Sequence, residues 1–92
     1  MAKYLMLGKY SVEAVKGIGP GRTKKAVEII KKNGGKASLM YILIGNYDIA
    51  LLVDFPGNKE LLKASIAMTK LTGICFTGYP ALSVDEFDKL AG

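Results

Sequence analysis

Apolar and polar positions alternate along the chain in a way that predicts strands and helices in succession. Residues 3–9 form an apolar run beside Gly8, which is typical of a strand. Ser11 can cap a short helix over residues 12–16, because its hydroxyl can accept from free amides of the first turn. A longer helix is expected from about Arg22, where one face carries Thr23, Ala26, Val27 and Ile30.

The clearest pattern is a pair of β-prone runs, residues 36–44 and 47–55, which are separated by Gly45-Asn46. Two residues of this kind between apolar runs predict a tight hairpin turn. The register that follows sets Ile44 opposite Tyr47. We therefore expect two long antiparallel strands joined by a two-residue turn.

Both faces of this hairpin are apolar. Side chains alternate across a strand, so one face carries Met40, Ile42, Ile44, Tyr47, Ile49, Leu51, Val53 and Phe55. The opposite face carries Leu39, Tyr41, Leu43, Ala50 and Leu52, with Asp48 and Asp54 towards its ends. A strand that packs on helices from one side only would need a single apolar face, so the second face calls for a second covering surface.

A third helix and a fourth strand complete the pattern. Pro56-Gly57-Asn58 breaks the hairpin strand, and Asn58 is the expected cap of a helix over residues 59–72. Its expected core stripe is Leu61, Ala64, Met68 and Leu71. A strand follows over residues 74–81. Ser83 to Glu86 then has the form of a capping box that opens a short helix through Leu90.

This order of elements predicts an α+β fold of the ferredoxin-like β-α-β-β-α-β type, in a single domain over residues 1–92. Right-handed crossovers place both helices on one face of a four-stranded antiparallel sheet. The other face would present Leu39, Tyr41, Leu43 and Leu52, a patch too apolar to remain in water. We therefore predict that these residues form a dimer interface, with two sheets packed face to face in a dimeric α+β barrel. The expected partner is a second copy of the chain, in a homodimer or a higher homo-oligomer.

Composition and charge narrow the possible functions. The net charge is +5, and the bases concentrate between Lys16 and Lys36, where Glu28 is the only acid. Such a cluster indicates either a binding surface for an anionic partner or simply the solvent-exposed face of a helix. The chain has no histidine, which removes the commonest metal ligand and the usual base near neutral pH, and no metal or cofactor is expected. The lone Cys75 fits a reducing, cytoplasmic setting and is expected to be a buried, inert thiol. No apolar run is long enough for a signal peptide or a membrane span.

Three segments together resemble a known family. Gly45-Asn46-Tyr47-Asp48, followed by a buried strand and a Pro-Gly-Asn break, is similar to the turn after which the GYD family is named. The opening residues 3–10 and the closing residues 83–87 resemble the ends of that family as well. The resemblance implies a ferredoxin-like subunit of the dimeric α+β barrel group, among small prokaryotic proteins without an assigned activity. The start of the last strand departs from the family, since Gly73 leads into Ile74-Cys75-Phe76-Thr77 rather than a basic residue and hydroxyls.

Tyr47 and Asp48 are the first candidate site. A phenol and a carboxylate at the mouth of a cavity could orient a small molecule, and Asp48 is the candidate catalytic proton acceptor. The alternative is structural, with Asp48 bonded to backbone amides of the turn and Tyr47 closing the end of the barrel.

Two further candidates involve a glycine loop and a set of tyrosines. Gly19, Gly21 and Arg22 lie where a helix begins, and free amides there can hold an anion, although the segment also serves as a simple connector. A ligand pocket could be lined by Tyr4, Tyr10, Tyr41 and Tyr79, although strand tyrosines are more often ordinary core or interface residues.

These observations leave three functions open. The favoured one is a homo-oligomeric module that binds a small molecule, with Tyr10, Tyr41, Tyr47 and Asp48 as ligand-binding residues. The second is a cofactor-independent enzyme that acts on an aromatic or quinone-like substrate. The third is binding of nucleic acid or another anion by the basic first long helix. Nucleic acid is the weaker possibility, because the central strand has two acids and lacks the basic motif of RNA-recognition sheets.

Overall fold

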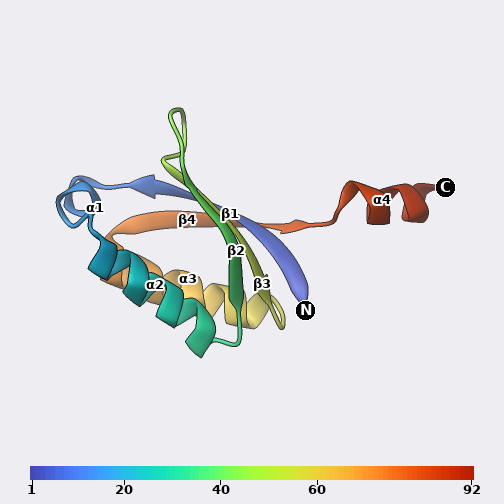
Figure 1. Cartoon of the computed structure of the whole chain (residues 1–92), viewed down its shortest axis with the longest axis horizontal. Helices are drawn as coiled ribbons and strands as arrows, with labels where there is room; N and C mark the ends of the chain where they lie inside the picture. Colours follow the sequence, from blue (N-terminus) through green and yellow to red (C-terminus); the bar gives the residue numbers. More distant parts are fainter.

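The computed structural model describes all 92 residues and shows the predicted order of elements. The elements are β1 (Ala2–Tyr10), α1 (Val12–Lys16), α2 (Pro20–Lys32), β2 (Lys36–Ile42), β3 (Ile49–Phe55), α3 (Asn58–Thr72), β4 (Ile74–Ala81) and α4 (Val84–Ala91). Figure 1 shows α2 and α3 below the sheet, with α4 beyond its far end. None of these helices is long and apolar enough to cross a membrane.

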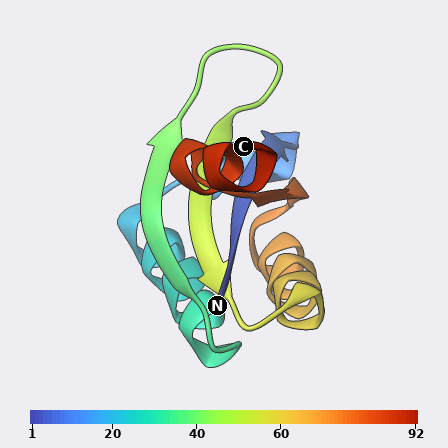
Figure 2. The same cartoon turned by 90° about the vertical axis from the view of Figure 1, so that its right-hand side faces the viewer.

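The four strands form one antiparallel sheet in the order β2-β3-β1-β4. Helices α2 and α3 lie side by side against the same face of this sheet (Figures 1 and 2). The α+β, ferredoxin-like prediction is therefore confirmed. The opposite face has no helix over it, and we call it the open face.

The core lies between the sheet and the two long helices. It is built mainly from alternate strand residues, because every second side chain of β1 and β3 points towards the helices. The buried residues that form it are Tyr4, Met6, Ala14, Ile30, Ile49, Leu51, Val53, Phe55, Ala64, Met68 and Ile74. Gly8 lies among them for a steric reason. A Cβ at this position would be 2.7 Å from methyl groups of both Ile49 and Ile74.

The predicted two-residue turn is wrong. β2 ends at Ile42 and β3 begins at Ile49, so residues 43–48 form a longer loop. The reason is that the backbone of Asp48 is hydrogen-bonded both to β1 and to Leu43, the residue that follows β2. Its amide donates to the Gly8 carbonyl over 2.8 Å, while its own carbonyl accepts from the Leu43 amide over 2.8 Å. The register inside the hairpin is as expected, with Ile42 opposite Ile49.

β2 also contains an irregularity that the sequence pattern does not reveal. Ala37 pairs with Val53 and Leu39 pairs with Leu52, so Ser38 is left without a partner. This is a β-bulge, which bends the strand locally and increases its twist. It allows Lys36 and Leu39 to lie on the same side of the sheet although they are three positions apart.

Helix boundaries differ slightly from the predicted ones. α2 begins at Pro20 rather than near Arg22, since proline is well suited to the first turn of a helix. Asn58 does not cap α3, because its side-chain oxygen accepts a 2.6 Å hydrogen bond from the Tyr4 hydroxyl. Leu71 is exposed and Thr72 is buried in its place, with its hydroxyl donating to the Met68 carbonyl over 2.7 Å.

The last strand places Cys75 on the open face, so the expectation of a buried thiol is wrong. Ile74 is buried on the helix side, and the next residue, Cys75, therefore points the other way and is exposed. It pairs with Lys9 of β1. The predicted caps at the two short helices are confirmed. Ser11 accepts from the Ala14 amide over 3.0 Å, and Ser83 accepts from the Glu86 amide over 3.1 Å.

The open face is apolar across all four strands. The pairing of the strands aligns its side chains in rows, and one row runs Leu39, Leu52, Leu5 and Tyr79. The next row runs Tyr41, Ala50, Leu7 and Thr77. A third row carries the ion pair between Lys3 and Asp54, whose atoms are 3.1 Å apart. The predicted interface residues Leu39, Tyr41 and Leu43 are exposed, and Leu52 is half-buried among its neighbours.

Candidate functional site

The main candidate site is a cleft between the first turn of α2 and the sheet, at the end where β1 finishes. Its volume is about 360 Å³, which is within the range of small-molecule sites. We call it the α2 cleft. Its lining is apolar with a few polar groups, and consists of Tyr10, Ile18, Gly19, Pro20, Arg22, Thr23, Met40, Tyr41, Ile42 and Ile49.

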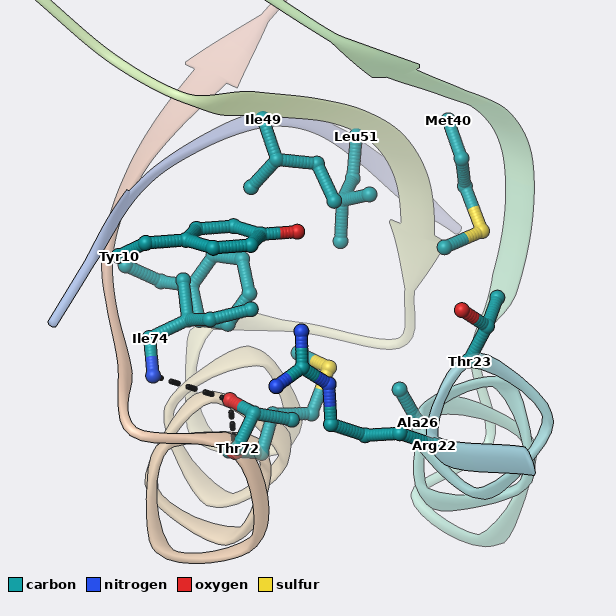
Figure 3. A pocket seen from close by; sticks show the side chains of 11 residues that line it. Tyr10, Arg22, Thr23, Ala26, Met40, Ile49, Leu51, Thr72 and Ile74 are labelled. Carbon is teal, nitrogen blue, oxygen red and sulfur yellow. Dashed lines mark hydrogen bonds between the residues drawn. The ribbon is translucent and has the colours of Figure 1, made fainter. Parts of the chain in front are cut away.

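The cleft continues inward to a chamber of about 40 Å³ between the helices and the sheet. Figure 3 shows the Tyr10 hydroxyl and the Arg22 guanidinium pointing into this space from opposite sides. Ile49 and Leu51 of β3 and Met40 of β2 form its apolar wall. The chamber is large enough for a few water molecules or for the end group of a ligand that enters from the cleft.

Arg22 is the central charged group of the site. Its side chain folds back so that Nη1 donates to the Ala14 carbonyl at the end of α1, and its guanidinium carbon lies 5.6 Å from the centre of the Tyr10 ring. Arg22 is half-buried and makes no ion pair with any carboxylate of the chain. A guanidinium has five N–H donors, so most of its hydrogen-bonding capacity is unused.

The other polar groups around the chamber are already hydrogen-bonded. Thr72 accepts from the Ile74 amide over 3.0 Å as well as donating to Met68, as the dashed lines in Figure 3 show. Thr23 donates to the Gly19 carbonyl over 3.3 Å. The Tyr10 hydroxyl forms no hydrogen bond within the chain. Tyr10 and Arg22 are therefore the side chains free to contact a polar ligand group.

Asp48 lies beside the cleft, in a second hollow between α1 and the 43–48 loop, and its carboxylate has a hydrogen-bond partner in the backbone. Its carboxylate accepts a 2.8 Å hydrogen bond from the backbone amide of Tyr10. Its main chain bonds to β1 and to Leu43, so the whole residue fastens the 43–48 loop to the end of β1. The same bond fixes the backbone that carries Tyr10. Asp48 thus acts on the α2 cleft through the position of the tyrosine.

Tyr47 does not join this cleft but lies near Tyr79 of the open face. The pKa of the Tyr79 phenol is raised above 10.0, first because its side chain hydrogen-bonds to that of Tyr47, and next through charge repulsion from the same residue. The two tyrosines therefore form a pair on the uncovered side of the sheet.

The structure brings together residues from two separately predicted sites. Tyr10, from the tyrosine set, and Gly19 and Arg22, from the anion loop, line one cleft. Tyr41 borders it from β2, although its place in the strand alternation is on the open face. The remaining candidates lie elsewhere, with Tyr4 in the core, Tyr79 on the open face and Gly21 exposed on α2.

Sequence reasoning missed the apolar half of the cleft. Met40, Ile42 and Ile49 were expected only as hairpin residues, and Ile18 was not singled out within the glycine loop. One signal was available, since Ile18 is an isolated large apolar residue between two glycines. The expectation for this loop named the free helix amides, whereas Figure 3 shows the side chain of Arg22 pointing into the chamber.

Comparison with known proteins identifies the family. A search of curated proteins found no match to the chain. The family model described as GYD domain matches residues 4–91, which include every strand residue that faces the cleft and the Gly45-Asn46-Tyr47-Asp48 segment. A match over nearly the whole chain, on a fold with the expected order of strands, means that this chain belongs to the GYD domain family.

Proposed function

We propose that the chain is the subunit of a homo-oligomeric module that binds a small molecule with an apolar or aromatic body and one anionic group. The observation that carries this proposal is the half-buried guanidinium of Arg22, which faces an apolar cleft of about 360 Å³ without an acidic partner. A carboxylate, sulfonate or phosphate in the cleft would supply the missing countercharge.

The chemistry of the cleft supports an anion of modest size. Removing a charged group from water without a partner is costly, so an arginine in an apolar recess gains from a bound anion. The planar guanidinium pairs with both oxygens of a carboxylate, and the Tyr10 hydroxyl can donate to the same group. The apolar wall around Met40 and Ile49 would cover the body of the ligand.

Self-association is supported by the open face. Its rows of leucine and tyrosine side chains cover the sheet from β2 to β4, with no helix of the same chain over them. Burying roughly 600–800 Å² per subunit is usual for a stable interface. At about 25 cal/mol per Å² of apolar area, it would contribute on the order of 10 kcal/mol before association costs. We propose that two copies pair through their open faces.

Catalysis and nucleic-acid binding have less support. The carboxylate that would act as a base, that of Asp48, already accepts the Tyr10 amide. Lys24, Lys25, Lys31 and Lys32 of α2 are exposed, as expected for a solvated helix face.

The test is a ligand screen with a matched pair of variants. Purified protein would be examined by native mass spectrometry for retained molecules, then melted with a panel of aromatic carboxylates and their neutral amides. The carboxylates should raise the melting temperature of the wild type, because a ligand at about one hundred times its Kd adds about 2.7 kcal/mol of stability. Arg22→Gln should abolish this rise, and Arg22→Lys should keep part of it.

Lys24→Gln is the control, because it removes the same charge from an exposed position on the same helix. It should leave the rise in melting temperature unchanged. If Arg22→Gln and Lys24→Gln respond alike, the guanidinium does not hold the ligand. If the amides raise the melting temperature as much as the carboxylates, the site is not an anion site.

A further inference from the structure

Helix α4 buries none of its residues against its own chain. Its apolar side chains are largely exposed, with Val84 at 73%, Phe87 at 59% and Leu90 at 76%. Figure 1 shows it beyond the end of the sheet, away from α2 and α3. A helix of eight residues is unstable in water by itself, and its capping serine contributes only about 1 kcal/mol. Its amphipathic shape therefore indicates a docking partner.

The apolar side chains of α4 lie on one side of the helix. Val84, Phe87 and Ala91 follow each other at intervals of three and four residues, and Leu90 flanks them. The charged residues occupy the other side and are mostly acidic, namely Asp85, Glu86, Asp88 and Lys89. The helix thus offers an apolar ridge bordered by negative charge.

A matching surface lies at the opposite end of the molecule. A groove of about 370 Å³ lies between α1 and the 43–48 loop, lined by Tyr10, Val15, Ile18, Ile42, Leu43 and Asp48. We call it the α1 groove. Its apolar side chains are exposed, with Val15 at 55%, Ile18 at 63% and Ile42 at 70%. It shares Tyr10, Ile18 and Ile42 with the α2 cleft.

The net charges favour contact between α4 and the body of a second copy. α4 carries three acids and one base, a net charge of −2, whereas residues 1–83 carry twelve bases and five acids, a net charge of +7. Asp48 is the only charged residue that lines the groove, and its carboxylate is already bonded to the Tyr10 amide. The exposed bases Lys9 and Lys16 adjoin the groove residues Tyr10 and Val15 in the sequence. An acidic helix is attracted to such a surface at ordinary ionic strength.

The groove of the same chain is out of reach. Ala81, the last residue of β4, pairs with Lys3, and Ile74 pairs with Tyr10 at the groove. Seven residues of strand separate these points, a distance of about 23 Å. The linker Leu82–Ser83 can place Val84 no further than about 10 Å from Ala81. Val84 and Phe87 therefore stay short of the groove of their own chain while β4 stays in the sheet, so the whole ridge cannot seat there.

We infer that α4 docks in the α1 groove of a second copy of the chain and closes the outer wall of that copy's α2 cleft. The inference rests on the proposed face-to-face pairing, with the two-fold axis across the strands. That symmetry lays the Ala81 end of one sheet over the Tyr10 end of the other. The 43–48 loop rises on the open-face side of the sheet (Figure 1), where the partner's α4 would meet it. Each ligand site would then be completed by the other subunit.

Site-directed cross-linking in the full chain tests this arrangement. Cys75 is exposed and is first replaced by serine, and cysteines are then introduced by Val15→Cys and Leu90→Cys. A short bismaleimide at low protein concentration should convert this variant into a covalent species of twice the 9.9 kDa chain mass. Phe87→Ser, added to the same variant, should lower the yield several-fold. A control pairs Leu90→Cys with Leu62→Cys, an equally exposed position on α3, and should give no dimer product.

The outcomes separate this inference from the proposed function. An intramolecular cross-link between positions 15 and 90 would show that α4 folds onto its own chain, and would overturn the inference. If the wild type is dimeric in solution but the 15–90 pair gives no cross-linked product, the docking of α4 is wrong and the proposed face-to-face pairing still stands. A monomeric wild type would overturn both the exchange of α4 and the proposed face-to-face pairing.

Discussion

Leu52→Lys is the sharpest test of association through the open face. Leu52 sits on β3 in a row between Leu39 and Leu5, so its side chain has an apolar neighbour on each side. It is half-buried already in the single chain. In a face-to-face dimer it would be central and fully covered. A lysine there would bring an ammonium group into an apolar contact, and the carboxylate in the next row, that of Asp54, is already paired with Lys3.

The expected magnitude follows from this position. Losing a buried leucine removes about 1.5–3 kcal/mol of apolar burial, and an unpaired buried charge costs several kcal/mol more unless it bends away to water. The lysine should therefore cost about 3 kcal/mol per copy. Two-fold symmetry applies the change twice, so about 6 kcal/mol weakens the dimer by on the order of ten-thousandfold. The single chain should lose no more than about 1 kcal/mol, as for a cross-strand pair.

Sedimentation velocity at micromolar concentration measures the result. The wild type should sediment as a dimer and Leu52→Lys as a monomer of 9.9 kDa, with a similar circular dichroism spectrum. Leu62→Lys makes the same change on the solvent side of α3 and should remain dimeric. A Leu52→Lys protein that stays dimeric would show that the open face is not the interface.

Two further predictions concern single hydrogen bonds. Asp48→Ala should cost about 1–3 kcal/mol, because the Tyr10 amide loses its acceptor, and should lower the melting temperature by about 4–8 °C per kcal/mol. Asp48→Asn keeps an acceptor oxygen and should recover most of this loss in the same calorimetric scan; equal losses would contradict the assignment. Because the pKa of Tyr79 is raised in the folded chain, the associated stability should be present below pH 10 and lost as pH rises through the folded pKa. An ultraviolet titration that compares the wild type with Tyr79→Phe should assign a raised pKa to Tyr79, and Tyr47→Phe should move it back towards 10.0.

The order of elements could be predicted because it depends on patterns that span many residues. The alternation along β1 and β3 and the helical spacing in α2 and α3 each repeat several times. One ambiguous residue therefore does not change the predicted element. The apolar character of both hairpin faces was likewise visible in the sequence. It predicted an uncovered side of the sheet, and the structure has one.

The errors arose where a single contact from a distant segment decided the local structure. Gly45-Asn46 has the composition of a tight turn, but the bonds of Asp48 to Gly8 and Tyr10 draw the chain to β1 and lengthen the loop. Thr72 displaces Leu71 from the core because its hydroxyl finds two backbone partners. No local pattern contains these partners, since they are brought together only by the fold.

In the candidate site, too, the residue types could be predicted from the sequence, whereas their contacts could not. The sequence singled out Tyr10, Tyr41, Gly19 and Arg22 by residue type, but for two separate reasons. Their meeting in one cleft depends on α1, which turns the chain back so that Arg22 reaches the Ala14 carbonyl and the Tyr10 ring. The missing countercharge of Arg22 could be seen only in three dimensions, because acids such as Glu13 and Glu28 lie close to it in the sequence.

The bulge at Ser38 has a consequence for how copies of the chain can assemble. β2 and β4 are the outer strands of the sheet, and each has an outward row of amides and carbonyls that could recruit a strand from another molecule. Ser38 distorts this row in β2, and Pro80 lacks an amide hydrogen in β4, so neither border presents a regular template. Growth of a continuous intermolecular sheet, the route to fibres, is thereby discouraged at both borders. An apolar sheet surface can then remain available for closed assembly without exposing the chain to open-ended polymerisation.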